Sequence, residues 1–155
     1  MINLDKVYTN SKGLEFVNRI LVNSLDLNSY SSIIDPCAGE GAFKTIIPVT
    51  QQYDISPDSK DIIKSNFFDI NLEFDINRLM ICSPPFGDDR GYKFLNHASK
   101  MGSCVAAIVS RKIEAENFID GFDLIKKKEF KDKCFNKNGI DIELKHLFCI
   151  WVKRV

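Results

Sequence analysis

Apolar residues along this chain occur in short runs that end at Gly, Pro, Asp or Ser, a pattern that predicts alternating helices and strands. Between Ser11 and Leu25 they recur every three or four positions, which predicts an amphipathic helix with Ser11 as its N-cap. The segment Tyr92–Met101 has the same periodicity and follows an apolar run, as a crossover helix between parallel strands would. The pattern therefore favours an α/β architecture.

Five segments have the apolar or β-branched character of buried strands. Prolines stop the first two, and only a short helix fits between them. The last two are apolar throughout, which indicates burial on both faces and hence a mostly parallel sheet. In chain order, the segments are Ser31–Asp35, Gln52–Ile55, Asp61–Phe68, Leu79–Cys82 and Cys104–Val109.

After Arg111 the pattern changes to that of an antiparallel ending. Asn136–Gly139 (NKNG) is a hairpin turn signal, because Asn and Gly tolerate the positive φ of tight turns. His146–Val152 (HLFCIWV) is a dense final strand that contains the only tryptophan. The sequence therefore predicts an α/β sheet that finishes in an antiparallel hairpin.

Composition adds limits on size and charge. The chain has 155 residues, 45% of them hydrophobic, with 21 basic and 21 acidic side chains. A chain of this size buries roughly 70% of its unfolded surface, so we expect one soluble globular domain over residues 1–155, without a separate target-recognition domain. A net charge of zero removes the general affinity for polyphosphate that a strongly basic domain has. Any contact with nucleic acid must therefore use local patches.

The five cysteines and two histidines carry no disulfide or metal signature. The cysteines are odd in number and form no C-x-x-C pair, which indicates reduced thiols in the cytoplasm, with the nucleus or a viral factory as alternatives. His97 and His146 have no Cys or His at ligand spacing, so we expect no metal. The N-terminal segment has neither a signal-peptide profile nor a membrane span, so we expect no membrane association.

A glycine turn, DPCAGEG (residues 35–41), follows the first predicted strand, at the end where open α/β sheets bind ligands. A dinucleotide-binding turn would have a third glycine at Lys44, and the acids Asp35 and Glu40 disfavour a pyrophosphate. With Asp54 at the end of the second strand, three carboxylates surround one pocket, which suits a ligand with cationic groups and a ribose diol. S-adenosylmethionine has an ammonium, a sulfonium and such a diol.

A second motif, SPPFG (residues 83–87), directly follows the fourth predicted strand. Its prolines have φ fixed at about −65° and no N–H, so the turn is rigid. An exocyclic base amine is a poor nucleophile, and acceptors placed at its two hydrogens help to localise its lone pair. The Ser83 hydroxyl and the Pro84 carbonyl are suitable acceptors, and Phe86 can stack on a base taken out of its helix. The alternative is an ordinary turn between a strand and a helix.

Together the two motifs resemble those of the class I S-adenosylmethionine-dependent methyltransferases, over most of the chain. SPPF is similar to the Asn/Asp-Pro-Pro-Tyr/Phe/Trp motif of the amino-methyltransferase branch, and the order of the motifs resembles N6-adenine enzymes and small phage or viral members. The resemblance implies a Rossmann-like methyltransferase fold with a mostly parallel seven-stranded sheet and a C-terminal antiparallel hairpin. It also implies S-adenosylmethionine as the cofactor.

The resemblance further assigns roles to particular residues. The residues from the glycine turn surround the methionyl part of the cofactor, Asp54 bonds its ribose, and Asn66 accepts from its adenine beside Phe67. Ser83, Pro84 and Phe86 are then the catalytic residues. The complete cofactor-binding set is Tyr8, Thr9, Asp35, Cys37, Gly39, Gly41, Asp54, Asn66 and Phe67.

Ser83 leaves the substrate open, since adenine enzymes usually carry Asn or Asp there and serine is familiar among enzymes that methylate the cytosine amine. The order of the motifs favours adenine N6 in DNA or RNA. Cytosine N4 and a protein glutamine amide are alternatives. So is a catalytically inactive binding or scaffold subunit, because a hydroxyl is a weaker acceptor than a carboxylate.

Basic residues that follow strand ends on the ligand side of the sheet are candidates to hold substrate phosphates. Because few residues remain beyond the core, the expected partner is single-stranded nucleic acid or an exposed base, or else a partner protein supplies recognition. The candidate substrate-binding residues are Pro85, Arg90, Lys93, Arg111 and Lys112.

Overall fold

The computed structural model describes residues 7–84 and 90–155, which form a seven-stranded sheet and a separate three-stranded sheet. The strand order of the large sheet is β4-β3-β2-β5-β6-β10-β7, and that of the small sheet is β1-β8-β9. The chain runs outward from β2 on one side and resumes at β5 on the other, so the strand order reverses between these two neighbours. Open α/β sheets bind their ligands at such a reversal.

The parallel part of the large sheet consists of five strands. They are β2 (Ser32–Asp35), β3 (Gln51–Asp54), β4 (Ile63–Lys64), β5 (Asp75–Cys82) and β6 (Gly102–Ser110). All five predicted strands are present, although the third is much shorter than the predicted segment and the fourth begins earlier. The carboxyl-terminal half of β5 and the centre of β6 are buried, as their unbroken apolar runs predicted.

An antiparallel part completes the large sheet. Strand β10 (His146–Lys153) lies between β6 and β7 (Phe122–Glu129) and is antiparallel to both. The predicted NKNG turn joins β8 (Phe135–Lys137) to β9 (Ile140–Ile142), with Asn138 and Gly139 at positive φ. This hairpin interrupts the chain between β7 and β10 and pairs with β1 (Val7–Thr9). It therefore carries the N-terminal strand instead of extending the large sheet.

The described residues contain two α-helices, α1 (Ser11–Ser24) and α2 (Arg90–Ala98), in the positions that the periodicity predicted. The N-cap prediction was wrong: the cap is Asn10, whose side-chain oxygen accepts from the Gly13 N–H at 3.0 Å, and Ser11 is already helical. Neither helix is long and apolar enough to cross a membrane. Residues 7–84 and 90–155 also contain four short 3₁₀ helices: η1 (Leu27–Ser29), η2 (Phe43–Thr45), η3 (Phe67–Asp69) and η4 (Ala115–Asn117).

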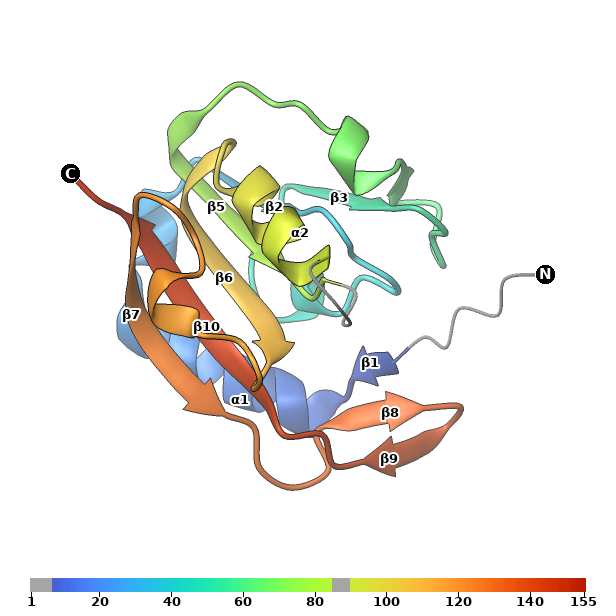
Figure 1. Cartoon of the computed structure of the whole chain (residues 1–155). Coiled ribbons are helices and arrows are strands. Elements are labelled where there is room, and N and C mark those ends of the chain that lie inside the picture. The colour runs from blue at the N-terminus through green and yellow to red at the C-terminus, as the bar shows by residue number, and fades with distance from the viewer. Residues whose placement is uncertain (1–6, 85–89) are drawn as a thin grey trace.

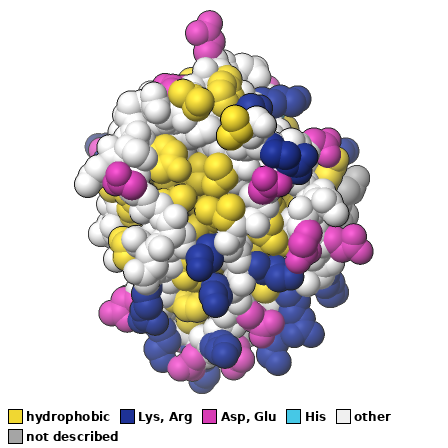
Figure 2. Space-filling model, turned by 90° about the vertical axis from the view of Figure 1, so that its left-hand side faces the viewer, with side chains coloured by type: hydrophobic (Ala, Val, Ile, Leu, Met, Phe, Trp, Pro, Cys, Tyr) yellow, Lys and Arg dark blue, Asp and Glu magenta, His cyan; other side chains and the backbone are white. Residues whose placement is uncertain are grey.

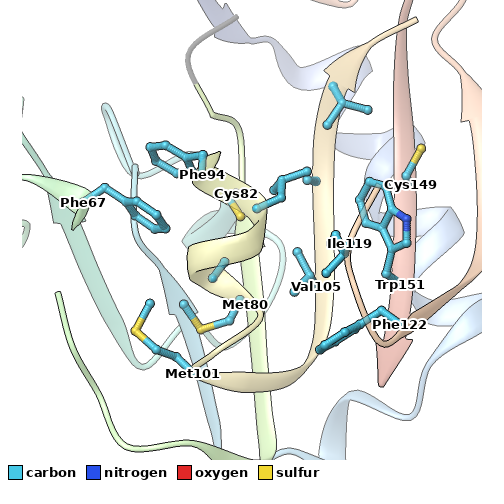
Figure 3. Packing of buried hydrophobic residues seen from close by; sticks show 14 of the residues in the cluster. Phe67, Met80, Cys82, Phe94, Met101, Val105, Ile119, Phe122, Cys149 and Trp151 are labelled. Carbon is cyan, nitrogen blue, oxygen red and sulfur yellow. The ribbon is translucent and has the colours of Figure 1, made fainter. Parts of the chain in front are cut away.

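Apolar side chains form one core layer on each face of the large sheet. Helix α1 covers one face with Val17 and Leu21, and α2 covers the other with Phe94 and Leu95. In Figure 1, α2 lies in front of the sheet and α1 behind it. Figure 3 shows part of the α2-side layer, in which Trp151 lies beside Ile119 and Phe122. Together the two layers hold the carboxyl ends of the parallel strands in place.

Strand β7 forms one edge of the large sheet. It carries consecutive lysines at 126–128, and charged side chains on an edge strand oppose pairing with another chain. On this side of the molecule hydrophobic side chains gather in the centre of the surface, with Lys and Arg mainly below them and Asp and Glu also at the margin (Figure 2). Ile125, which is 44% exposed, lies on this strand. The β7 side therefore combines an apolar centre with a margin that carries charges of both signs.

Candidate functional site

A cavity of about 860 Å³ lies at the carboxyl ends of β2, β3 and β5, next to the strand-order reversal. Its volume is in the range of small-molecule and cofactor sites. Its lining comes from segments that are distant in sequence: Val7–Thr9, Pro36–Glu40, Ala42, Phe43, Asp54, Ile55, Ser65–Phe68, Ser83, Pro84, Lys93 and Phe94. The fold thus brings the glycine turn, the acid after β3 and the start of the proline motif to one site.

Asp54 organises the glycine turn from the end of β3. One carboxylate oxygen accepts from the Gly39 N–H at 2.7 Å, and the other accepts from the Ser56 N–H at 2.8 Å. Gly39 has a φ of +60°, a conformation that glycine adopts at little cost. Each carboxylate oxygen has a further lone pair, so Asp54 can also accept from hydroxyl groups of a ligand.

Tyr8 of β1 covers the glycine turn. Its ring lies 3.5 Å from the position that a Cβ would have on Gly39, and its hydroxyl donates to the Asp58 carboxylate at 2.6 Å. Burial and this hydrogen bond raise the pKa of the Tyr8 hydroxyl well above its ordinary value, and the charges of Glu40 and Asp54 add to the rise. The rim beside Tyr8 is therefore negative, which favours a ligand with positive charge.

Aromatic rings form the opposite wall. Phe67 and Phe94 are stacked, with ring centroids 3.6 Å apart and planes 11° from parallel, and Phe68 meets Phe94 edge to face. The Asn66 side-chain oxygen caps η3 by accepting from the Phe68 N–H at 3.0 Å. The Asn66 oxygen, which the motif resemblance assigned to the cofactor adenine, thus already accepts one hydrogen bond from the protein backbone. Phe67 and Phe94 are each only 5% exposed, whereas Phe68 is 46% exposed, so Phe68 presents most of the open apolar surface of this wall.

Ser83 and Pro84 lie where β5 ends, and both line the cavity. The half-buried Cys37 lines it as well, and its sulfur receives a hydrogen bond from the backbone of Ser83. Burial raises the pKa of the Cys37 and Cys82 thiols well above their ordinary value. Both are therefore neutral thiols at neutral pH, and neither is set up as a nucleophile.

Several residues that the sequence singled out lie elsewhere. Asp35 is fully buried, and neither Asp35 nor Gly41 belongs to the cavity lining. Arg111 and Lys112 are exposed after β6 and do not line the cavity either. Pro85 and Phe86 lie outside the described residues, as does the side chain of Arg90.

Other residues enter the site without having been predicted. Phe94 reads in the sequence as a core residue of the crossover helix, and only the stack on Phe67 brings it to the cavity wall. Asp58 lies in a polar loop, where no sequence motif marks it as a site residue. Only its hydrogen bond with the Tyr8 hydroxyl links it to the site. Both depend on contacts between segments that are far apart in the chain.

The histidines take part in packing. His97 bonds the Ile70 carbonyl at 2.8 Å and meets the Phe67 ring edge to face, while the half-buried His146 packs against Phe135. Over residues 7–84 and 90–155, no three His, Cys, Asp or Glu side chains are grouped so that they could hold a metal ion. All five cysteines are free thiols.

No protein-family model matches the sequence, and no curated protein sequence matches it significantly. Solved structures match its fold. The 23S rRNA methyltransferase ErmE is similar with a TM-score of 0.65 at 11% identity, over 96% of this chain and 70% of that one. A proposed RNA methyltransferase from Pyrococcus horikoshii gives a TM-score of 0.60 at 16% identity, over 94% of this chain and 84% of that one.

A third match is M. jannaschii TYW2, solved in complex with AdoMet. Its TM-score is 0.53 at 14% identity, over 94% of this chain and 78% of that one. The chain therefore has the Rossmann-like methyltransferase fold, as its motifs predicted.

Proposed function

We propose that this protein is an S-adenosylmethionine-dependent methyltransferase that acts on an exocyclic amine of a nucleic-acid base, with adenine N6 as the target. The single observation that carries the proposal is that one cavity collects the glycine turn, Asp54 and the Ser83-Pro84 end of the proline motif. The turn and Asp54 suit the cofactor, and the proline motif suits the amine. A cavity of about 860 Å³ has room for the cofactor and for the substrate base.

The residues of the cavity fit the cofactor group by group. Asp54 has acceptor capacity for ribose hydroxyls, and the aromatic wall, in which Phe68 is the exposed ring, suits the adenine ring. The negative rim of Glu40, Asp54 and Asp58 suits the ammonium and the sulfonium. When bound, S-adenosylmethionine supplies a methyl group on a positively charged sulfur, which is an electrophile toward an amine nitrogen.

On the substrate side, the chain supplies acceptors and positioning. The Ser83 hydroxyl and the Pro84 carbonyl would accept from the two amine hydrogens, which orients the nitrogen lone pair toward the methyl group. Phe86, outside the described residues, would stack on the base. Lys93 at the cavity would hold a phosphate beside that base.

Two of the similar structures are described as RNA methyltransferases, which supports nucleic acid as the substrate class. With no net charge, the chain has little general attraction for a duplex backbone. A single-stranded or exposed base fits this property best, since it can enter a cavity without the cost of unstacking a paired base.

The deciding experiment incubates the purified protein with methyl-labelled S-adenosylmethionine and separate pools of single-stranded DNA, duplex DNA, RNA and protein, followed by nucleoside analysis. We expect N6-methyladenine in a single-stranded pool. Label on cytosine N4 would keep the enzyme class and change the base, whereas label on a polypeptide would contradict the nucleic-acid substrate. Cofactor binding with no label in any pool would indicate an inactive or partner-dependent subunit.

The cofactor assignment predicts an effect of Asp54→Asn. An amide at this position must turn its NH₂ toward the N–H of either Gly39 or Ser56, so one of these two hydrogen bonds is lost together with the charge. We expect binding of S-adenosylhomocysteine to weaken by about 10- to 100-fold, because hydrogen bonds to charged groups contribute about 1.5–3 kcal/mol. Isothermal titration calorimetry measures the change.

The matched control is Asp61→Asn, an exposed acid of the loop after β3. It should leave the dissociation constant unchanged. If both variants bind the cofactor as the wild type does, Asp54 has no part in binding it.

A further inference from the structure

Two buried polar atoms beneath the cavity have no hydrogen-bond partner. Among the described residues, the buried side-chain oxygens without a partner are Ser24 Oγ, Asp35 Oδ2 and Gln52 Oε1. Asp35 has no exposed surface, and Gln52 is 6% exposed. A buried polar atom without a partner costs about 1–3 kcal/mol, so two such atoms at one place call for a physical explanation.

The two atoms belong to direct neighbours in the sheet. Asp35 ends β2 and is the register partner of Gln52 on the parallel strand β3. Ile34 and Tyr53 point to the α2-side core, so by alternation Asp35 and Gln52 both point to the α1 side. Neighbouring strands lie about 4.8 Å apart. The two acceptor oxygens thus belong to side chains on the same face of adjacent strands, and a proton on the Asp35 carboxyl would allow it to donate to Gln52.

The surroundings of Asp35 keep that proton in place. Burial is the main cause that raises the pKa of Asp35 from its ordinary 3.8 to about 8; the Asp54 charge adds to the rise, and the Cys37 N–H bond opposes it. The other titratable neighbours are the thiols of Cys37 and Cys82, which are themselves neutral. Asp35 is therefore an uncharged acid at neutral pH, able to donate through its hydroxyl.

The pair also touches the glycine turn at both of its ends. The other oxygen of Asp35 accepts from the Cys37 N–H at 3.2 Å. At the far end of the turn, Gln52 Oε1 lies 2.8 Å from the position that a Cβ would have on Gly41. Asp35 therefore bonds the backbone near the start of the turn, and Gln52 lies against the backbone near its end.

We propose that Asp35 is a positioning residue that donates a hydrogen bond to Gln52 and supports the glycine turn from below, and that it is not an anionic ligand of the cofactor. As far as it concerns the cofactor, the inference rests on the proposed function. It departs from the role that the sequence motif assigned to Asp35, because the side chain is buried outside the cavity lining.

The test is Asp35→Asn, since an amide keeps the acceptor for Cys37 and donates permanently to Gln52. In the wild type, the stability that Asp35 contributes is fully present below about pH 4 and is lost as the pH rises to about 8, because the folded-state pKa is the higher one. We expect ligand-free Asp35→Asn to melt at least about 4 °C above the wild type at pH 8, with a flatter pH profile. Circular dichroism between pH 4 and pH 9 measures this.

Binding of S-adenosylhomocysteine to the same variant is the second readout. At pH 7 the dissociation constant of Asp35→Asn should stay within about threefold of the wild-type value. A loss of more than about tenfold, with an unchanged pH profile of melting, would make Asp35 an anionic ligand and overturn the inference. Absence of cofactor binding in the wild type would instead refute the proposed function, and the melting profile of the ligand-free protein would still test the link to Gln52.

Gln52→Met provides the partner variant, because methionine has a similar shape and no amide oxygen. Burial raises the pKa of Asp35 in either background, so the bond itself is tested at pH 5, where wild-type Asp35 is protonated. Gln52→Met should destabilise the wild type more than it destabilises an Asp35→Ala variant, as a double-mutant cycle between bonded residues requires. An equal cost in both backgrounds would show that Asp35 does not donate to Gln52. Asp61→Asn serves as the control acid on the surface and should leave the pH profile unchanged.

Discussion

Replacing Ser83 by alanine should lower the rate of methyl transfer about 100- to 1,000-fold, because the amine loses one of two acceptors that act mainly in the transition state. Ser83 lies at the cavity where β5 ends, whereas the groups that we propose for the cofactor come from β1, the turn after β2, the end of β3 and the aromatic wall of η3 and α2. The dissociation constant of S-adenosylhomocysteine should therefore stay within about twofold of the wild-type value. Single-turnover transfer to the labelled pool, together with calorimetry, separates the two effects.

Ser83→Asn distinguishes an acceptor from a packing role. An amide oxygen still accepts from the amine, so this variant should retain more transfer than Ser83→Ala. Ser29→Ala in η1, at the opposite end of the strands, is the matched control and should behave as the wild type. Wild-type rates in Ser83→Ala would remove Ser83 from the mechanism. Transfer that appears only in Ser83→Asn would show that the serine makes the natural protein inactive.

Replacing Trp151 by alanine should have the largest effect on stability. Trp151 has no exposed surface, stacks on Phe118 and donates from its indole nitrogen to the Ala115 carbonyl at 2.8 Å. Figure 3 shows it in the α2-side core. Truncation of a buried Trp costs about 3–5 kcal/mol, which corresponds to a melting temperature roughly 10 °C lower for a chain of this length. Chemical unfolding followed by circular dichroism measures it.

Two further variants calibrate this result. Trp151→Phe keeps a ring but leaves the Ala115 carbonyl without its donor, so the loss should be smaller, about 1–3 kcal/mol. Ile140→Ala, at a side chain that is 66% exposed in the β8–β9 hairpin, should change the unfolding free energy by less than about 0.5 kcal/mol. A Trp151→Ala protein as stable as Ile140→Ala would contradict the described core.

Local patterns predicted most of the fold because strands and helices respond to nearest-neighbour periodicity. The runs around β2, β3, β5, β6 and β10 and the periodicity of α1 and α2 each stand out without knowledge of the rest of the chain. The Asn138-Gly139 turn could also be predicted from the sequence, since its backbone conformation depends on those two residues. The extra length of β5 could not be predicted, because its first four residues (DINR) are exposed or half-buried and form no apolar run.

The sequence predicted which kinds of residues form the site, but it did not predict which side chains contact one another there. Tyr8, Gly39, Asp54 and Ser83 were found from motifs, and the structure brings them to one cavity. The partnership of Tyr8 with Asp58 was not predictable, because it joins residues 50 positions apart through one hydrogen bond. The same holds for Phe94, whose place in the wall depends on η3 packing against α2.

By itself the sequence determined the alternation of elements, the glycine turn and the proline motif, because each of these depends on local backbone preferences and on neighbouring side chains. Only the tertiary structure decided that the β8–β9 hairpin carries β1 beside the cavity, and that Asp35 is fully buried outside the cavity lining. Strand pairing and burial are set by the free energy of the whole packed chain. They decide which of several equally polar side chains reaches a ligand and which is kept neutral inside.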